Sequence, residues 1–177
     1  MSQEKNNMKE LILYHGTFEQ NYKKILNEGF IENNFYRSDA TKSIDECLNY
    51  YGNEGNLRGG AIFLFDSTKY TGSYDNIFTV STKDLNLNYL YIADFQTSTD
   101  IYDSLMRGKE DDVKKFVKAY ENSFMRFEEY LKKGENIITP EFLYFDKIPL
   151  DIVKVVSLDD IIDDVFKEYE IEEPSGY

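Results

Sequence analysis

The single histidine of this 177-residue chain, His15, is the first candidate for chemistry. It stands at the end of an apolar run, residues 11–14, and Gly16 follows it at once. A glycine lets backbone approach a ligand closely, and residues 17–20, Thr-Phe-Glu-Gln, have the form of a capping box that begins a helix. The sequence therefore places His15 and Gly16 at a strand-to-helix corner, which resembles half of a ligand site. A hydrogen-bonded structural histidine is the alternative interpretation.

The motifs of several large enzyme classes are missing. The chain has no Gly-x-Gly-x-x-Gly, no P-loop Gly-Lys-Ser/Thr, no His-Glu-x-x-His, no Cys-x-x-Cys and no Gly-x-Ser-x-Gly. The sequence therefore disfavours four enzyme classes: dinucleotide oxidoreductases, P-loop NTPases, zincins and serine hydrolases. With one histidine and no Asp-x-Asp-x-Asp-Gly loop, no metal site is indicated.

Composition limits the class of protein and its partners. The length favours a single domain over residues 1–177. A net charge of −13 disfavours nucleic acid, because such a surface repels phosphate backbones. The lone Cys47 excludes an internal disulfide and is expected to be buried. Since no apolar run reaches the roughly 18 residues of a membrane span, we expect a cytoplasmic protein with no membrane partner.

Apolar periodicity and turn residues predict the elements of the first half of the chain. A helix is expected from residue 18 until Gly29 ends it, and a second, of about two turns, from a capping box at Ser43 until Gly52. Residues 53–60 form a loop rich in glycine and asparagine. A buried strand over 61–65 follows it, and two more strands are expected over 76–81 and 87–93.

The second half is expected to begin with the longest helix, a five-turn apolar stripe from Val113 to Leu131 that Gly134 ends. Two strands, 141–145 and 152–158, should flank a turn at 146–149, and a last helix should contain residues 161–166. The sum is an α+β domain of about six strands and four or five helices, without regular βαβ alternation.

Three separated segments together resemble the ADP-ribosyltransferase superfamily of the diphtheria-toxin and poly-ADP-ribose polymerase type, which is known by an ordered His, Tyr, Glu triad. They are residues 14–17, Tyr-His-Gly-Thr; residues 60–66, Gly-Ala-Ile-Phe-Leu-Phe-Asp, with Tyr74 downstream; and residues 140–143, Pro-Glu-Phe-Leu. The family's middle motif has a first tyrosine, which is Phe63 here, and a second eleven residues later, which is Tyr74. The resemblance implies a split mixed β-sheet core with flanking helices.

The same resemblance implies a role for each residue in binding NAD as co-substrate, without a metal. His15 would hydrogen-bond the adenosine ribose, the backbone of Gly16 beside Thr17 would hold the nicotinamide carboxamide, and Tyr74 would stack on the nicotinamide ring. Phe63 would keep the apolar wall but lack a hydroxyl. Glu141 would stabilise the oxocarbenium-like charge that develops as the bond between nicotinamide and ribose breaks. A solvated strand-end carboxylate is the structural alternative for Glu141, and ordinary core packing is the alternative for Phe63.

The position two residues before the catalytic glutamate often decides the acceptor in the Arg-Ser-Glu branch of the superfamily. Here it is Thr139, neither the Glu associated with arginine acceptors nor the Gln associated with other side chains. The loop 134–140 is expected to face the acceptor, and Glu135 would steer a basic target surface. If Glu135→Lys leaves acceptor modification unchanged, the steering hypothesis fails.

The function implied is mono-ADP-ribosylation of a macromolecule, with a protein side chain as the acceptor and nicotinamide as the product. A toxin or a phage-encoded effector acting in the host cytoplasm fits a small transferase without a second domain. Two alternatives stay open. One is a degenerate module that binds NAD, ADP-ribose or a partner protein, and the other is an NAD glycohydrolase.

Overall fold

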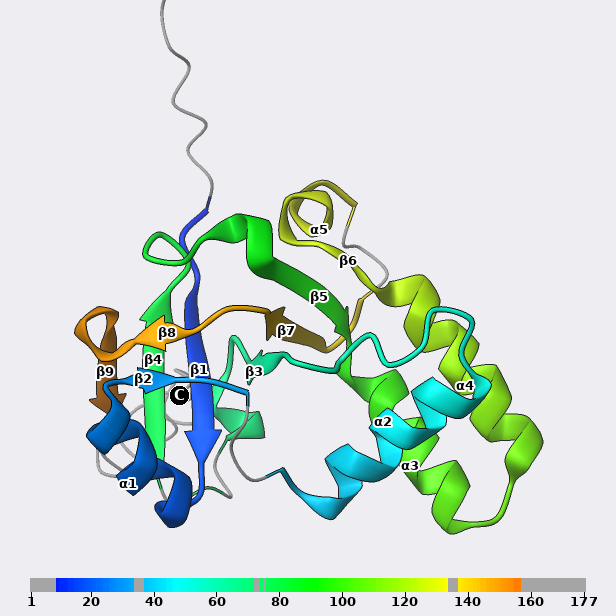
Figure 1. The fold of residues 1–177 in the computed structure, drawn as a ribbon. Helices are drawn as coiled ribbons and strands as arrows, with labels where there is room; N and C mark the ends of the chain where they lie inside the picture. The colour runs from blue at the N-terminus through cyan, green and yellow to red at the C-terminus, as the bar shows by residue number, and fades with distance from the viewer. Residues whose placement is uncertain (1–8, 34–36, 72–73, 75, 134–136, 157–177) are drawn as a thin grey trace, which may run out of the picture.

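The protein has an α+β fold in a computed structural model that describes residues 9–33, 37–71, 74, 76–133 and 137–156 (Figure 1). One sheet has the order β1-β4-β9 and a second has the order β3-β7-β5-β6, and a short ribbon, β2-β8, is separate. The strands are β1 (Ile12–Thr17), β2 (Phe30–Ile31), β3 (Ile62–Leu64), β4 (Asn76–Ser81), β5 (Leu90–Asp94), β6 (Met125–Arg126), β7 (Pro140–Tyr144), β8 (Ile148–Pro149) and β9 (Val153–Val156). The expected α+β class is confirmed.

The two larger sheets meet at one point, where β1 passes the end of β3. Tyr14 and Phe65 form an isolated bridge there, with backbone hydrogen bonds of 2.7 and 2.9 Å. The sheet is therefore split, with His15 directly after the bridge. Every strand pairing in the described residues is antiparallel, where the family resemblance implied a mixed sheet.

Two hydrophobic clusters lie on opposite faces of the second sheet. Alternation along β7 sends Phe142 and Tyr144 to one cluster and Leu143 to the other. The helices α2 (Asp39–Tyr51), α3 (Phe95–Met106) and α4 (Glu110–Ser123) pack on the Leu143 face, to the right in Figure 1. Cys47 is buried in this second cluster, as its composition suggested. Glu141 lies two residues before Leu143 on the same strand, so its side chain belongs to the same face.

The first two helices differ from expectation at their starts. Helix α1 (Glu19–Glu28) ends at Gly29 as predicted, in the left-handed conformation, but its N-cap is Phe18. Thr17 is the last residue of β1, paired with Asn76, so strand pairing takes the residue that the capping box would use. Helix α2 begins at Asp39 with Ser38 as its cap, whose Oγ accepts from the Thr41 N–H at 3.2 Å. The predicted start at Ser43 is wrong.

The predicted five-turn helix is two helices with a strand between them. After α4 ends at Ser123, β6 pairs with Tyr91 and Ile92 of β5, and α5 (Phe127–Lys133) then starts. The apolar spacing continues across the break because Phe127, the first residue of α5, is itself buried in the core. Helix α3 was not predicted at all. Strand β6 was missed for a different reason: it forms by pairing with β5, which is distant in the sequence, and such pairing leaves no signal in the local apolar pattern.

The two strands predicted over 141–145 and 152–158 are present as β7 and β9, but they do not pair with each other across the turn. Strand β7 lies in the second sheet and β9 pairs with β4 in the first, while the intervening turn contributes β8, which pairs with β2. Strand 76–81 is confirmed with its exact bounds, 61–65 appears as β3, and 87–93 is confirmed from Leu90 onwards, after a 3₁₀ turn, Leu87–Tyr89. The helix expected around 161–166 lies outside the described residues. No helix in the described ranges has the length and apolar character to span a membrane.

Candidate functional site

His15 is held against the neighbouring sheet by its ring. Its Nδ1 lies 2.9 Å from the carbonyl oxygen of Phe63, across the split between β1 and β3. Because a carbonyl only accepts, Nδ1 carries the proton. Burial lowers the pKa of His15 below 6.5, while the Phe63 carbonyl opposes that shift. The imidazole is therefore neutral at pH 7, and its Nε2 presents a lone pair that accepts a hydrogen bond.

Gly16 is required by the position of Tyr74. A Cβ placed on Gly16 would lie 2.3 Å from Cδ2 and 2.7 Å from Cγ of the Tyr74 ring. The ring is also packed edge-on against Phe18, with centroids 5.0 Å apart. Tyr74 thus lies directly on the backbone of β1, and only a residue without a side chain leaves room for it.

One pocket brings together five of the six predicted site residues. His15, Gly16, Thr17, Phe63 and Tyr74 all line it. It measures about 90 Å³, which is less than the roughly 300–1,000 Å³ of sites that enclose whole ligands. The space suits one ring or sugar, so a dinucleotide would extend beyond it. A second hollow shares Glu32 and Asn33 with the pocket and offers the adjoining surface.

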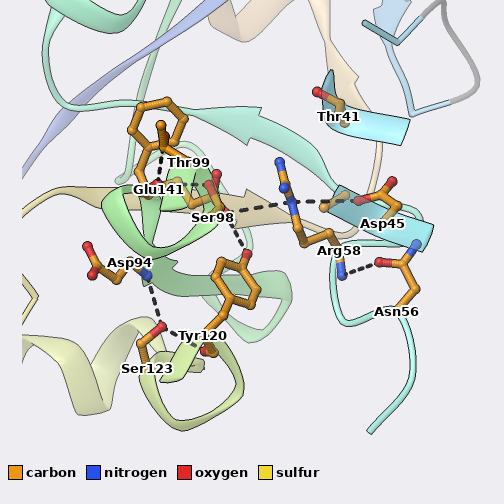
Figure 2. A network of polar contacts seen from close by, with 12 residues as sticks. Thr41, Asp45, Asn56, Arg58, Asp94, Ser98, Thr99, Tyr120, Ser123 and Glu141 are labelled. Carbon is orange, nitrogen blue, oxygen red and sulfur yellow. Dashed lines mark hydrogen bonds and ion pairs between the residues drawn. The ribbon is translucent and has the colours of Figure 1, made fainter. Parts of the chain in front are cut away.

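Glu141, the sixth residue, does not line this pocket. Its side chain is fully buried at the start of β7, where its Oε1 accepts from the hydroxyl of Tyr120 at 2.5 Å. The same oxygen lies 3.7 Å from Nε of Arg58. Figure 2 shows Arg58 between Glu141 and Asp45, with Tyr120 reaching the carboxylate from α4. A solvated strand-end carboxylate, the structural alternative considered for Glu141, is therefore wrong.

Arg58 links Glu141 to the pocket. Its guanidinium is 4.6 Å from the centroid of the Phe63 ring, and the guanidinium of Arg37, which lines the pocket, is 4.8 Å from the same centroid. Two guanidiniums therefore pack on the Phe63 ring, which also lines the pocket. Glu141 thus contacts Arg58, which packs on the pocket residue Phe63, and does not itself line the pocket.

The charges of this cluster balance. Arg37 pairs with Asp45 at 2.8 Å, and Arg58 lies 3.7 Å from both Asp45 and Glu141. Burial lowers the pKa of Arg37. Burial also disfavours the charged form of Arg58, but Glu141 in particular reverses that effect and raises the pKa of Arg58. Two guanidiniums and two carboxylates therefore face one another in a buried cluster whose formal charges sum to zero.

Several polar atoms of the cluster have no hydrogen bond in the described part of the chain. They are Oδ1 of Asp45, Nε and Nη1 of Arg58, and Oε2 of Glu141, all buried. Buried polar atoms are normally satisfied. In the described part of the chain, both the guanidinium of Arg58 and the carboxylates of Asp45 and Glu141 therefore keep atoms that could still form a hydrogen bond.

Sequence reasoning missed four members of the cluster: Arg37, Asp45, Arg58 and Tyr120. Arg58 lies in the predicted glycine-rich loop and Tyr120 in the apolar stripe of a predicted helix, so each had an ordinary local explanation. The only available signal was a tyrosine in a stripe of residues without polar groups. Since a buried tyrosine usually bonds its hydroxyl, that position called for a partner.

The acceptor loop is described only in part. The carbonyl of Thr139 accepts from the Phe95 N–H at 2.8 Å, which ties the start of β7 to α3. Glu135 lies outside the described residues. No group of three or more His, Cys, Asp or Glu side chains within the described ranges is placed to hold a metal ion.

Comparison with known proteins finds no counterpart: no protein-family model, no curated protein and no solved structure matches this chain. Any function assigned to the chain therefore rests on its own residues and their arrangement.

Proposed function

We propose that the protein is a mono-ADP-ribosyltransferase, which transfers ADP-ribose from NAD to a protein side chain and releases nicotinamide. The observation that carries the proposal is the convergence of separate segments. His15 and Gly16 from β1, Phe63 from β3 and Tyr74 from the loop before β4 line one pocket. Arg58, which packs on the Phe63 ring, lies 3.7 Å from Glu141. These are the positions that the family resemblance selects from the sequence.

The pocket residues have the chemistry that such a ligand needs. Nε2 of His15 accepts a hydrogen bond from a ribose hydroxyl, because its Nδ1 proton is committed to the Phe63 carbonyl. The close contact of Tyr74 with Gly16 places an aromatic ring directly against the backbone of β1 in the pocket, which suits a flat carboxamide. The guanidinium of Arg37 at the pocket wall suits the negative charge of a diphosphate.

Glu141 supplies the carboxylate for the reaction. Its negative charge would stabilise a positive centre developing on the ribose, and its Oε2 has no partner among the described residues. Because Glu141 is fully buried and does not line the pocket, the reaction requires a rearrangement of this cluster that exposes Oε2. The Arg58–Glu141 contact, at 3.7 Å, is longer than the 2.8 Å ion pair of Arg37 with Asp45.

The buried state of Glu141 favours a second candidate, a module that binds NAD or ADP-ribose without turnover. Two guanidiniums pack on Phe63, and they would repel the positive charge of the nicotinamide ring of NAD. Hydrolysis of NAD is the third outcome, since water competes with any protein acceptor.

Incubation with NAD labelled in the nicotinamide ring separates these functions. We expect the wild type to release labelled nicotinamide and Glu141→Gln to retain only a small residual release without loss of NAD binding. Asp94→Asn, on the neighbouring strand β5 where Asp94 pairs with Pro140, is the matched carboxylate control and should retain activity. Binding without release supports the module, and full activity in Glu141→Gln refutes the catalytic assignment.

The remaining parts of the proposal concern partners and place. The net charge of −13 supports a protein acceptor over nucleic acid, and the free buried Cys47 is compatible with a reducing cytoplasm, including that of a host cell. Mass spectrometry of a host lysate after expression would reveal the acceptor as protein that has gained ADP-ribose.

A further inference from the structure

Tyr120 is the closest polar neighbour of Glu141 and belongs to neither the pocket nor β7. It comes from the buried face of α4, where Val113 and Val117 precede it on the same stripe. Its hydroxyl donates to Oε1 of Glu141 at 2.5 Å, a length typical of a charge-assisted bond to a carboxylate. Both side chains are fully buried, so no solvent competes for this bond.

Tyr120 is a hydrogen-bond donor at neutral pH. Burial and the adjacent charge of Glu141 raise the pKa of Tyr120 well above 10. Its hydroxyl therefore stays protonated, and because its proton is directed at the carboxylate, it fixes where Oε1 lies.

The two partners of the carboxylate share one oxygen. Tyr120 bonds Oε1, and the nearest atom of Arg58, Nε, is placed at Oε1 as well, while Oε2 is buried without a hydrogen bond in the described residues. An unpaired carboxylate oxygen in a buried site is costly. The arrangement holds one oxygen and leaves the second available to a ligand group.

We propose that Tyr120 is a positioning residue, which holds Glu141 by Oε1 so that Oε2 meets the ribose of the substrate. This inference rests on the proposed function. It gives helix α4 a role in the site, through a residue that neither lines the pocket nor belongs to the sequence motifs. It also explains why a polar contact is kept at the centre of an otherwise apolar helix face.

The test is Tyr120→Phe, which removes one oxygen atom. If Tyr120 only positions Glu141, kcat for nicotinamide release falls about 10- to 100-fold, as expected when one hydrogen bond to a charged group is lost. The KM for NAD and the NAD affinity stay unchanged. Tyr144→Phe is the matched control, because Tyr144 is a buried tyrosine of β7 whose hydroxyl contacts the Asn86 N–H on the other face of the sheet. It should retain both constants.

A second comparison distinguishes positioning from a purely structural role. In the Glu141→Gln background, Tyr120→Phe should change the residual kcat no further, because both residues act through the same carboxylate. A structural role would instead lower thermal stability and raise KM together with the loss in kcat. If Tyr120→Phe does not fold, Glu141→Asp replaces it. The shorter acid keeps the negative charge but withdraws it from both Tyr120 and Arg58, so kcat should fall at constant KM.

Each outcome has a separate meaning. Wild-type kcat in Tyr120→Phe, or in Glu141→Asp, overturns the positioning role and leaves the proposed function intact. A wild type that releases no nicotinamide overturns the proposed function and the positioning role with it.

Discussion

Gly16→Ala should disturb the pocket through a single contact, the one with Tyr74. The added Cβ would lie 2.3 Å from Tyr74 Cδ2, whereas ordinary contacts begin at 3.4 Å, so the ring must move by about 1 Å. Overpacking of this kind costs about 1–3 kcal/mol. Gly16 does not have a positive φ, so alanine strains no backbone there and regains about 0.4–1 kcal/mol by restricting the unfolded chain. The net expectation is a loss of about 0–2.6 kcal/mol in the free energy of unfolding.

A double-mutant cycle with Tyr74→Ala isolates this contact. Without the ring, the alanine at position 16 has room, so Gly16→Ala should become neutral or mildly stabilising, and the coupling energy should be about 1–3 kcal/mol. Urea denaturation of the four proteins measures it, provided that the m-value is constant. NAD affinity, measured in parallel by calorimetry, should fall in Gly16→Ala because the displaced ring enters the pocket. A coupling energy below about 0.5 kcal/mol would refute the packing of Tyr74 on Gly16.

Three further predictions concern the rest of the site. Burial lowers the pKa of His15 below 6.5, so as the pH falls below about 6.5 the unfolded chain takes up a proton that the folded protein does not. In pH-dependent denaturation the wild type should therefore lose stability over that window relative to His15→Gln. Parallel curves for the two proteins would contradict a buried neutral imidazole. Glu141→Ala leaves Arg58 buried without its nearest carboxylate on β7 and should cost about 3–5 kcal/mol by urea denaturation. The added change Arg58→Met should recover much of that loss, and no recovery would mean that the ion pair is not its source. Ser38→Ala should lower the free energy of unfolding by about 1 kcal/mol in thermal unfolding, because Ser38 caps α2. Ser43→Ala, inside the same helix, should not change it. The reverse result would support the helix start that was predicted from the sequence.

The candidate site could be predicted in part because its pocket residues lie beside local signals. His15 and Gly16 come directly after an apolar run, and Phe63 and Tyr74 are eleven residues apart in the sequence. The structure places His15 and Gly16 inside strand β1 and not at the corner after it. The structure adds what that spacing cannot show, which is the contact between side chains from different segments. Tyr74 lies on Gly16, and the guanidiniums of Arg37 and Arg58 pack on Phe63.

Local pattern predicted elements well where each element satisfies its own hydrogen bonds or shows a period. Strand β4 and the end of α1 are of this kind. Pattern failed where a distant partner decided the outcome. Pairing with β5 interrupts the apolar stripe at Met125 and Arg126, and pairing with β4 takes β9 away from β7.

The sequence by itself determined the α+β class, the buried single cysteine and the ordered set of His15, Phe63, Tyr74 and Glu141. These depend on composition, on periods of 2 and 3.6 residues and on order along the chain, all of which are local properties. Only the tertiary structure decided that Glu141 is buried beside Arg58 and held by Tyr120, which is 21 residues away. The physical reason is that burial and electrostatic pairing are set by which chain segments meet in the core, and no local pattern around Glu141 encodes the helix that packs over it.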